Sequence, residues 1–290
     1  MLGKLASFIR PAAATAVPHS PLLPQILHVL GNDIASAKSF EVRTSIAIDH
    51  ALSYFVLQTA NIPGPLNLTE DNFPASPQLA GLFPEAGDVR RAFGRSLAVK
   101  SSLRPLRQAG HEEIHALLGL RIKPHGPAGD AGEPTPADHV LHSLAPNLES
   151  TRDSLCRAAF ERILKDFAEH VEKLRRRQRL SKLEWEWNLQ HDVVRTVETG
   201  QPEYVYAEQE LTPDKLLNGL ISWLEKPEAF FRVMSTRDDE PALAPQGSTA
   251  IPALHCSDRR KWRICFIRFS ADEAADALRS ETHNHRYLFI

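Results

Sequence analysis

The sequence is poor in cysteine and has no long apolar run. It contains 3 cysteines in 290 residues, and this small odd number excludes a disulfide scaffold and is typical of a reducing compartment. No apolar stretch approaches the roughly 18 residues that indicate a membrane-spanning helix, so we expect no membrane span. The basic and acidic residues nearly balance, 34 against 36, which argues against a uniformly basic nucleic-acid binder and still allows a local basic patch.

Several catalytic signatures are also missing. The chain has no G-x-S-x-G nucleophile elbow, no G-x-x-x-x-G-K-[ST] phosphate loop and no G-x-G-x-x-G fingerprint. These absences remove the simplest sequence support for an α/β-hydrolase, a kinase, an NTPase or a dehydrogenase.

Acidic residues are absent from positions 1–32, where Lys4 and Arg10 are the only Lys or Arg residues. An acid-free N-terminus that can form a short amphipathic helix is partly typical of mitochondrial transit peptides, although these are richer in Arg and Ser. We therefore expect a cytoplasmic location, with a mitochondrial location as the alternative.

Apolar residues make up 42% of the chain, enough for a sizeable core, and up to about residue 200 they follow helical spacing. Stretches rich in Pro and Gly near 61–77, 123–137 and 238–252 predict loops or linkers. Spacings of three and four predict helices over 39–60 and from Pro84 onward.

The longest periodic segment predicts a helix over 150–198, either continuous or broken near residue 178. Its apolar stripe includes Phe160, Ile163, Phe167, Val171 and Leu174 and continues through Leu180, Leu183 and Trp187. A solitary helix cannot bury so long a stripe. We expect the helix to pack against the N-terminal helices or a partner, and we predict a dimer through residues 155–197.

After Pro202 the pattern changes. Strands are expected over 203–208, 229–235, 260–269 and 287–290, and helices over 213–224 and 270–279. The resulting β-α-β-β-α-β order is the ferredoxin-like arrangement. The predicted fold class is therefore α+β, with a predominantly helical region 1–200 followed by a small ferredoxin-like domain 203–290.

The string His111-Glu112-Glu113-Ile114-His115 matches H-E-x-x-H. On a helix, residues i and i+4 share a face, so His111 and His115 can bind one zinc ion while Glu112 acts as general base. The string resembles the motif of zincin metallopeptidases, and this resemblance implies a zinc-dependent hydrolase. It departs from the family because Glu113 stands where an apolar residue usually follows, and no third ligand is evident. The alternative is a solvated helical face.

A second set of metal-ligating residue types lies near the C-terminus. Glu281, His283 and His285 alternate, so on a strand they share one face, and His255, Cys256 and Cys265 belong to the same predicted domain. A Cys/His metal site is chemically reasonable, but no C-x-x-C pair supports it. The alternative is a polar C-terminal turn beside free thiols.

A cluster of basic residues lies on the predicted long helix. Its members are Lys173, Arg175, Arg176, Arg177, Arg179 and Lys182. Such a local positive field attracts phosphate backbones in a salt-sensitive way. The alternative is a solvated helix face whose cations pair with neighbouring acids.

The order of elements after residue 202 resembles that of RNA-recognition motifs, whose third strand carries aromatics that stack on bases. Phe266-Ile267-Arg268-Phe269 matches the tail of that strand motif, but Arg263 stands where Gly belongs. The resemblance implies RNA binding through Trp262, Phe266 and Arg268 if they face outward. If helices cover this face, the same aromatics belong to the core.

These patterns favour a non-catalytic binding or scaffolding protein that acts through the long helix and the C-terminal sheet, with a protein partner or a second copy. The first alternative is RNA binding through the basic cluster 173–182 and the sheet. The second is a zinc-dependent hydrolase at His111, Glu112 and His115.

Overall fold

A computed structural model provides the structure of the chain. It describes residues 20–69, 79, 82–83, 85–122, 136–190, 203–234, 251–256 and 261–280. The N-terminal segment, the expected strand 287–290 and the candidate ligands Glu281, His283 and His285 lie outside the described residues. In the described part of the chain, no helix combines the length and the apolar character needed to cross a bilayer.

One mixed sheet of six strands forms the centre of the molecule, in the order β3-β2-β6-β5-β4, with β1 pairing in parallel to β6. Its strands are β1 (Leu66–Asn67), β2 (Glu113–Ile122), β3 (Pro136–Ala145), β4 (Phe231–Met234), β5 (Ala253–Cys256) and β6 (Lys261–Ser270). The β6 strand pairs with β2 along almost its whole length, from Trp262 to Ser270. Strands from both sides of residue 200 therefore share one sheet.

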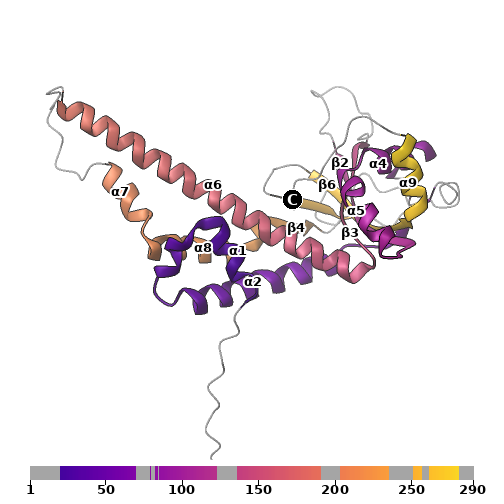
Figure 1. Cartoon of the computed structure of the whole chain (residues 1–290), viewed down its shortest axis with the longest axis horizontal. Coiled ribbons are helices and arrows are strands. Elements are labelled where there is room, and N and C mark those ends of the chain that lie inside the picture. The colour runs from indigo at the N-terminus through magenta and orange to yellow at the C-terminus, as the bar shows by residue number, and fades with distance from the viewer. Residues whose placement is uncertain are drawn as a thin grey trace, which may run out of the picture.

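Helices cover both faces of this sheet, because β6 is apolar on both sides. Trp262, Ile264 and Phe266 belong to one core, and Cys265, Ile267 and Phe269 belong to the other. The first core is closed by α1 (Leu23–Leu30), α2 (Phe40–Ala60), α6 (Leu148–Gln190) and α8 (Pro213–Leu224). The second is closed by α4 (Ala86–Arg95), α5 (Leu97–Gln108) and α9 (Ala271–Ser280). Figure 1 shows these two groups of helices as the two lobes of the molecule.

The N-terminal region is predominantly helical, as expected, and α2 lies almost where the periodicity predicted it. The helix expected from Pro84 onward is two helices. Ser96 separates them, and its hydroxyl oxygen accepts a hydrogen bond of 3.2 Å from the backbone N–H of Val99, which caps α5.

Three strands of the described part of the region 1–200, β1, β2 and β3, were not predicted. The β2 strand is apolar nearly throughout, with Ile114 and Leu117 buried on opposite sides of the sheet. A strand that is buried on both faces has no polar alternation, so its sequence resembles that of a buried helix.

The long helix α6 is continuous through residue 178 and spans 43 residues, which corresponds to about 64 Å. It begins after Asn147, whose side-chain oxygen accepts a 2.8 Å hydrogen bond from the backbone N–H of Ser150. The first half of α6 packs on the sheet and on α2, and Val171 is its last buried residue among those described. Beyond Val171 the helix extends away from the sheet, with α7 (Glu203–Glu210) beside it (Figure 1).

The strand expected over 203–208 is wrong, because these residues lie in the helix α7 (Glu203–Glu210). This helix packs against α6, and that tertiary contact overrides the strand preference of Tyr204, Val205 and Tyr206. The described elements after residue 202 run α7-α8-η3-β4-β5-β6-α9, where η3 is a short 3₁₀ helix over Pro227–Ala229. The fold is therefore α+β, but the ferredoxin-like order is not confirmed.

Candidate functional site

The H-E-x-x-H string does not lie on a helix. His111 and Glu112 precede β2, and His115 is part of that strand, opposite Arg268 of β6. The predicted helical placement, which would bring both imidazoles to one metal, is therefore wrong. Burial lowers the pKa of His115. Among the residues that the structure describes, no group of three His, Cys, Asp or Glu residues is arranged to hold a metal ion.

The aromatic residues of β6 do not form an open stacking platform. Trp262 is 2% exposed and Phe266 is fully buried. The guanidinium carbon of Arg152 on α6 lies 5.5 Å from the centre of the Phe266 ring, so the long helix covers this face. Arg268 is exposed and forms an ion pair of 3.5 Å with Glu113. The outward orientation required for base stacking is therefore wrong, and the aromatics are core residues.

Two histidines of β3 are structural. The imidazole of His139 stacks on Phe83 at 4.2 Å between ring centres and donates a 2.7 Å hydrogen bond to the carbonyl oxygen of Leu82. His142 lies opposite Leu117 in β2, and burial lowers its pKa to about 4. Both imidazoles are half-buried and make contacts within the fold.

The C-terminal part of α6, residues 173–190, carries exposed apolar side chains beside a cluster of charges, and we call it the α6 arm. The arm exposes four large apolar side chains, including Trp185 by 42%. The three most exposed are Leu180 by 62%, Leu183 by 61% and Trp187 by 56%. Because they occupy positions i, i+3 and i+7, they share one face of the helix. Arg176, four residues before Leu180, extends the same face.

This exposed stripe does not continue the buried stripe of α6. Leu174 is half-buried at the end of the stripe that contains Phe167 and Val171. The six residues from Leu174 to Leu180 rotate the chain by about 600° at 100° per residue, which leaves Leu180 about 240° around the helix. The single apolar stripe predicted for this helix is therefore wrong, and the angle between Leu174 and Leu180 is the sequence signal that separates the two stripes.

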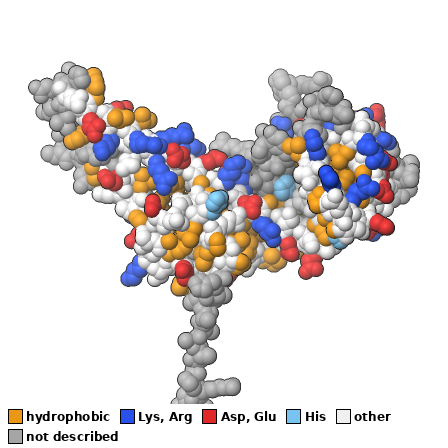
Figure 2. Space-filling model, in the orientation of Figure 1, with side chains coloured by type: hydrophobic (Ala, Val, Ile, Leu, Met, Phe, Trp, Pro, Cys, Tyr) orange, Lys and Arg blue, Asp and Glu red, His pale blue; other side chains and the backbone are white. Residues whose placement is uncertain are grey.

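Charge on the arm changes sign along its length. Six cations and no acid occupy residues 173–182, and Glu184 and Glu186 follow them. Figure 2 shows basic side chains gathered along the arm. The Glu172 carboxylate pairs with Arg179 at 3.0 Å and with Arg176 at 3.5 Å on the exposed surface. The predicted basic cluster is thus brought together on one solvent-exposed segment.

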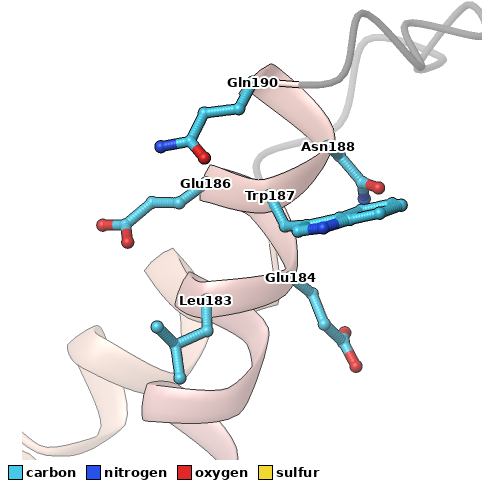
Figure 3. Close-up of a pocket in the computed structure, with 6 residues that line it drawn as sticks. All are labelled: Leu183, Glu184, Glu186, Trp187, Asn188 and Gln190. Atoms are coloured by element: carbon cyan, nitrogen blue, oxygen red, sulfur yellow. The ribbon is translucent and has the colours of Figure 1, made fainter.

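The end of the arm borders an open hollow of about 760 Å³. In Figure 3, Glu186 and Gln190 project together to one side of the helix above Leu183, and the indole of Trp187 lies near Asn188. The described side chains that line the hollow include apolar, amide and acidic groups. Such a mixture can bind the surface of another polypeptide.

A second open groove, of about 500 Å³, runs between α5 and α9. Lys100, Arg104, Arg107 and Arg279 line it around an apolar floor that includes Leu103. Arg107 is already engaged in an ion pair of 2.6 Å with Asp272. The groove therefore carries less uncompensated charge than its lining suggests.

Comparisons with models of known protein families, with curated proteins and with solved structures found no match to this chain. Its function is therefore inferred from the geometry and chemistry of its surfaces.

Proposed function

We propose that this chain is a non-catalytic binding or scaffolding protein, and that the α6 arm binds a helix of a protein partner. The observation that carries this proposal is the stripe of Leu180, Leu183 and Trp187, each more than half exposed on the part of α6 that extends away from the sheet. Exposed apolar side chains that gather on one face are typical of docking surfaces.

The chemistry of the stripe suits a helical partner. Apolar residues at i, i+3 and i+7 are the anchors that helix-in-groove recognition uses. Full burial of one such side chain contributes about 1.5–3 kcal/mol. Trp and Arg are also enriched among the residues that dominate binding energy, and the arm places Trp187 and Arg176 on the same face.

The sheet supports this function as a rigid base rather than as a binding face. Both of its faces are covered by helices, and the first half of α6 is anchored there through Leu155, Phe160 and Ile163, all fully buried. A helix held firmly at one end presents its other end with little loss of conformational entropy on binding.

Site-specific photocrosslinking tests the proposal. A photoreactive aromatic amino acid replaces Leu183 in the full chain, in cells that produce it, and a matched chain carries the same group at Glu161. Glu161 is exposed on the same helix but outside the arm. We expect protein adducts from position 183 and none from position 161. Equal or absent adducts at the two positions would remove the proposal.

A second candidate function, RNA binding, is favoured by the six cations of residues 173–182 alone, since the sheet offers no stacking face. Arginine next to exposed tryptophan is a combination found in single-strand binding surfaces. A fluorescent single-stranded RNA is titrated with the chain and with a variant carrying Arg175→Gln, Arg176→Gln and Arg177→Gln. RNA binding predicts affinity that the variant loses and that falls as salt rises. No binding at about 50 mM salt excludes this function.

A further inference from the structure

We propose that the helix bound by the α6 arm is the same arm of a second copy, and that the two arms pair antiparallel around a two-fold axis. This inference rests on the proposed function and names the partner. The pairing places Leu180 against the partner's Leu183, and Arg176 against the partner's Trp187.

The spacing of the exposed face sets this register. Arg176, Leu180, Leu183, Trp187 and Gln190 are separated by 4, 3, 4 and 3 residues, which is the alternation of the a and d positions in a coiled coil. In an antiparallel pair, each a residue faces a d residue of the other helix. The centre of the pair then consists of four leucines, two from each copy. On either side of it, a guanidinium lies over an indole, which is a favourable cation–π arrangement.

The charges that flank the stripe are self-complementary in this register. Arg179 and Glu186 lie on one edge of the stripe, and Arg177 and Glu184 lie on the other. The two-fold axis brings Arg179 to the partner's Glu186 and Arg177 to the partner's Glu184. Each of these pairs occurs twice, so four ion pairs border the four central leucines.

The same charges disfavour a parallel pair. In parallel helices Arg176 would face the partner's Arg176 within the seam, and the six cations of residues 173–182 would lie beside six identical cations. Like charges that are directly opposed are destabilising. The antiparallel pair instead sets the basic half of each arm against the acidic end of the other.

In the described part of the chain, no residue buries the face formed by Leu180, Leu183 and Trp187, which is therefore open to a partner. Residues 173–190 span 18 positions, or about 27 Å of helix. The body packs on the opposite side of α6, where Phe167 and Val171 are buried, and the two bodies would lie at opposite ends of the paired arms. An interface of this size falls near or below about 1,000 Å², so weak and reversible association is expected.

Sedimentation equilibrium of the purified full chain, from about 1 to about 200 µM, is the first measurement. We expect a monomer–dimer equilibrium that Leu183→Glu abolishes without loss of helical circular dichroism. The matched control is Ile46→Glu, at a 65% exposed site on α2, which leaves the equilibrium unchanged. A chain that stays monomeric, or a dimer that persists in Leu183→Glu, overturns the inference.

A charge exchange then tests the register. Arg179→Glu puts a carboxylate opposite the partner's Glu186, and Glu186→Arg puts two guanidinium groups together, so each variant alone dimerises about ten-fold more weakly. A mixed dimer contains one chain of each variant. In it, both contacts between position 179 of one chain and position 186 of the other join opposite charges. We expect the mixed dimer to be tighter than either homodimer, and the double variant to match the original chain. A mixed dimer of intermediate affinity overturns the antiparallel register.

The photocrosslinking experiment separates this inference from the proposed function on which it rests. Adducts from position 183 with twice the mass of the chain support a second copy. Adducts of any other mass, together with a monomer in sedimentation, leave the binding function in place and overturn the self-association.

Discussion

The Nδ1 atom of His142 lies 2.7 Å from the hydroxyl oxygen of Ser143, the next residue of β3. Ser143 has a φ of 54°, a left-handed conformation that is uncommon for residues other than glycine, and it is buried. This pair lies next to the irregularity in pairing between His115 and Leu117 of β2. Burial lowers the pKa of His142 to about 4, so this half-buried ring is neutral at pH 7.

The first prediction concerns the stability of the fold in acid. The pKa of His142 is about 4 in the folded chain and about 6.5 when unfolded. The unfolded chain therefore binds more protons between these values, and stability is fully present above pH 6.5 and is lost as the pH falls towards 4. Between pH 7.5 and pH 5 we expect a loss of about 2 kcal/mol from this residue.

Urea unfolding at both pH values tests this prediction with His142→Gln and, as a control, with His28→Gln at an exposed site on α1. The His142→Gln chain is expected to lose about 2 kcal/mol less than the control on acidification. If acidification lowers the free energy of unfolding equally in both variants, His142 does not cause the loss.

A second prediction concerns Phe266, the ring that the RNA-binding interpretation placed on the surface. Because this ring is fully buried, Phe266→Ala should cost about 3–5 kcal/mol of unfolding free energy. The exposed Ile46→Ala control should change it by less than about 0.5 kcal/mol. Chemical unfolding measures both values, and a near-neutral Phe266→Ala would contradict the burial of β6 between two helical layers.

Gly64 carries a third prediction. Its φ is 116°, and a Cβ atom built there would overlap the backbone carbonyl of Phe266 in β6. Pro63 accepts a 2.7 Å hydrogen bond from the backbone N–H of Phe266, so the two segments cannot move apart freely. Gly64→Ala should therefore destabilise the fold by more than about 3 kcal/mol.

Gly110 is the matched control for that change, because its φ of 85° is also positive but open space surrounds it. Gly110→Ala should lower the free energy of unfolding only by the cost of backbone strain, about 1–2 kcal/mol. Equal losses of thermal stability in the two variants would show that the close approach to β6 contributes nothing.

The fourth prediction is that Cys265 is chemically inert in the folded chain. Burial raises its pKa to about 12, and burial also raises the pKa of Cys156. The thiolate is the reactive form, so iodoacetamide at pH 8 should label neither residue until urea unfolds the chain. Peptide mass spectrometry measures the labelling, and modification of Cys265 without urea would contradict its position in the second core.

Much of the helical structure was predictable because one face of each helix is buried and the other is wet. The helices α2, α8 and α9 and the strand β6 lie within a few residues of their predicted bounds. The basic cluster on α6 was likewise predictable as an exposed segment, because six charges without acids cannot be buried together.

The unpredicted features depend on neighbours that are distant in the sequence. The β2 strand exists because β6, some 150 residues later, supplies its hydrogen-bond partners, and α7 is helical where α6 packs against it. The same holds for Trp262 and Phe266, whose aromatic character was evident and whose burial follows only from the covering helices.

The amino-acid sequence by itself determined where the apolar and charged side chains fall along each helix, since periodicity and charge are local properties. Only the tertiary structure decided which of those side chains meet water. Val171 is the last buried residue in the described part of α6, and the apolar residues after it lie on another face of the helix. Leu180 and Leu183 are therefore exposed instead of joining the core.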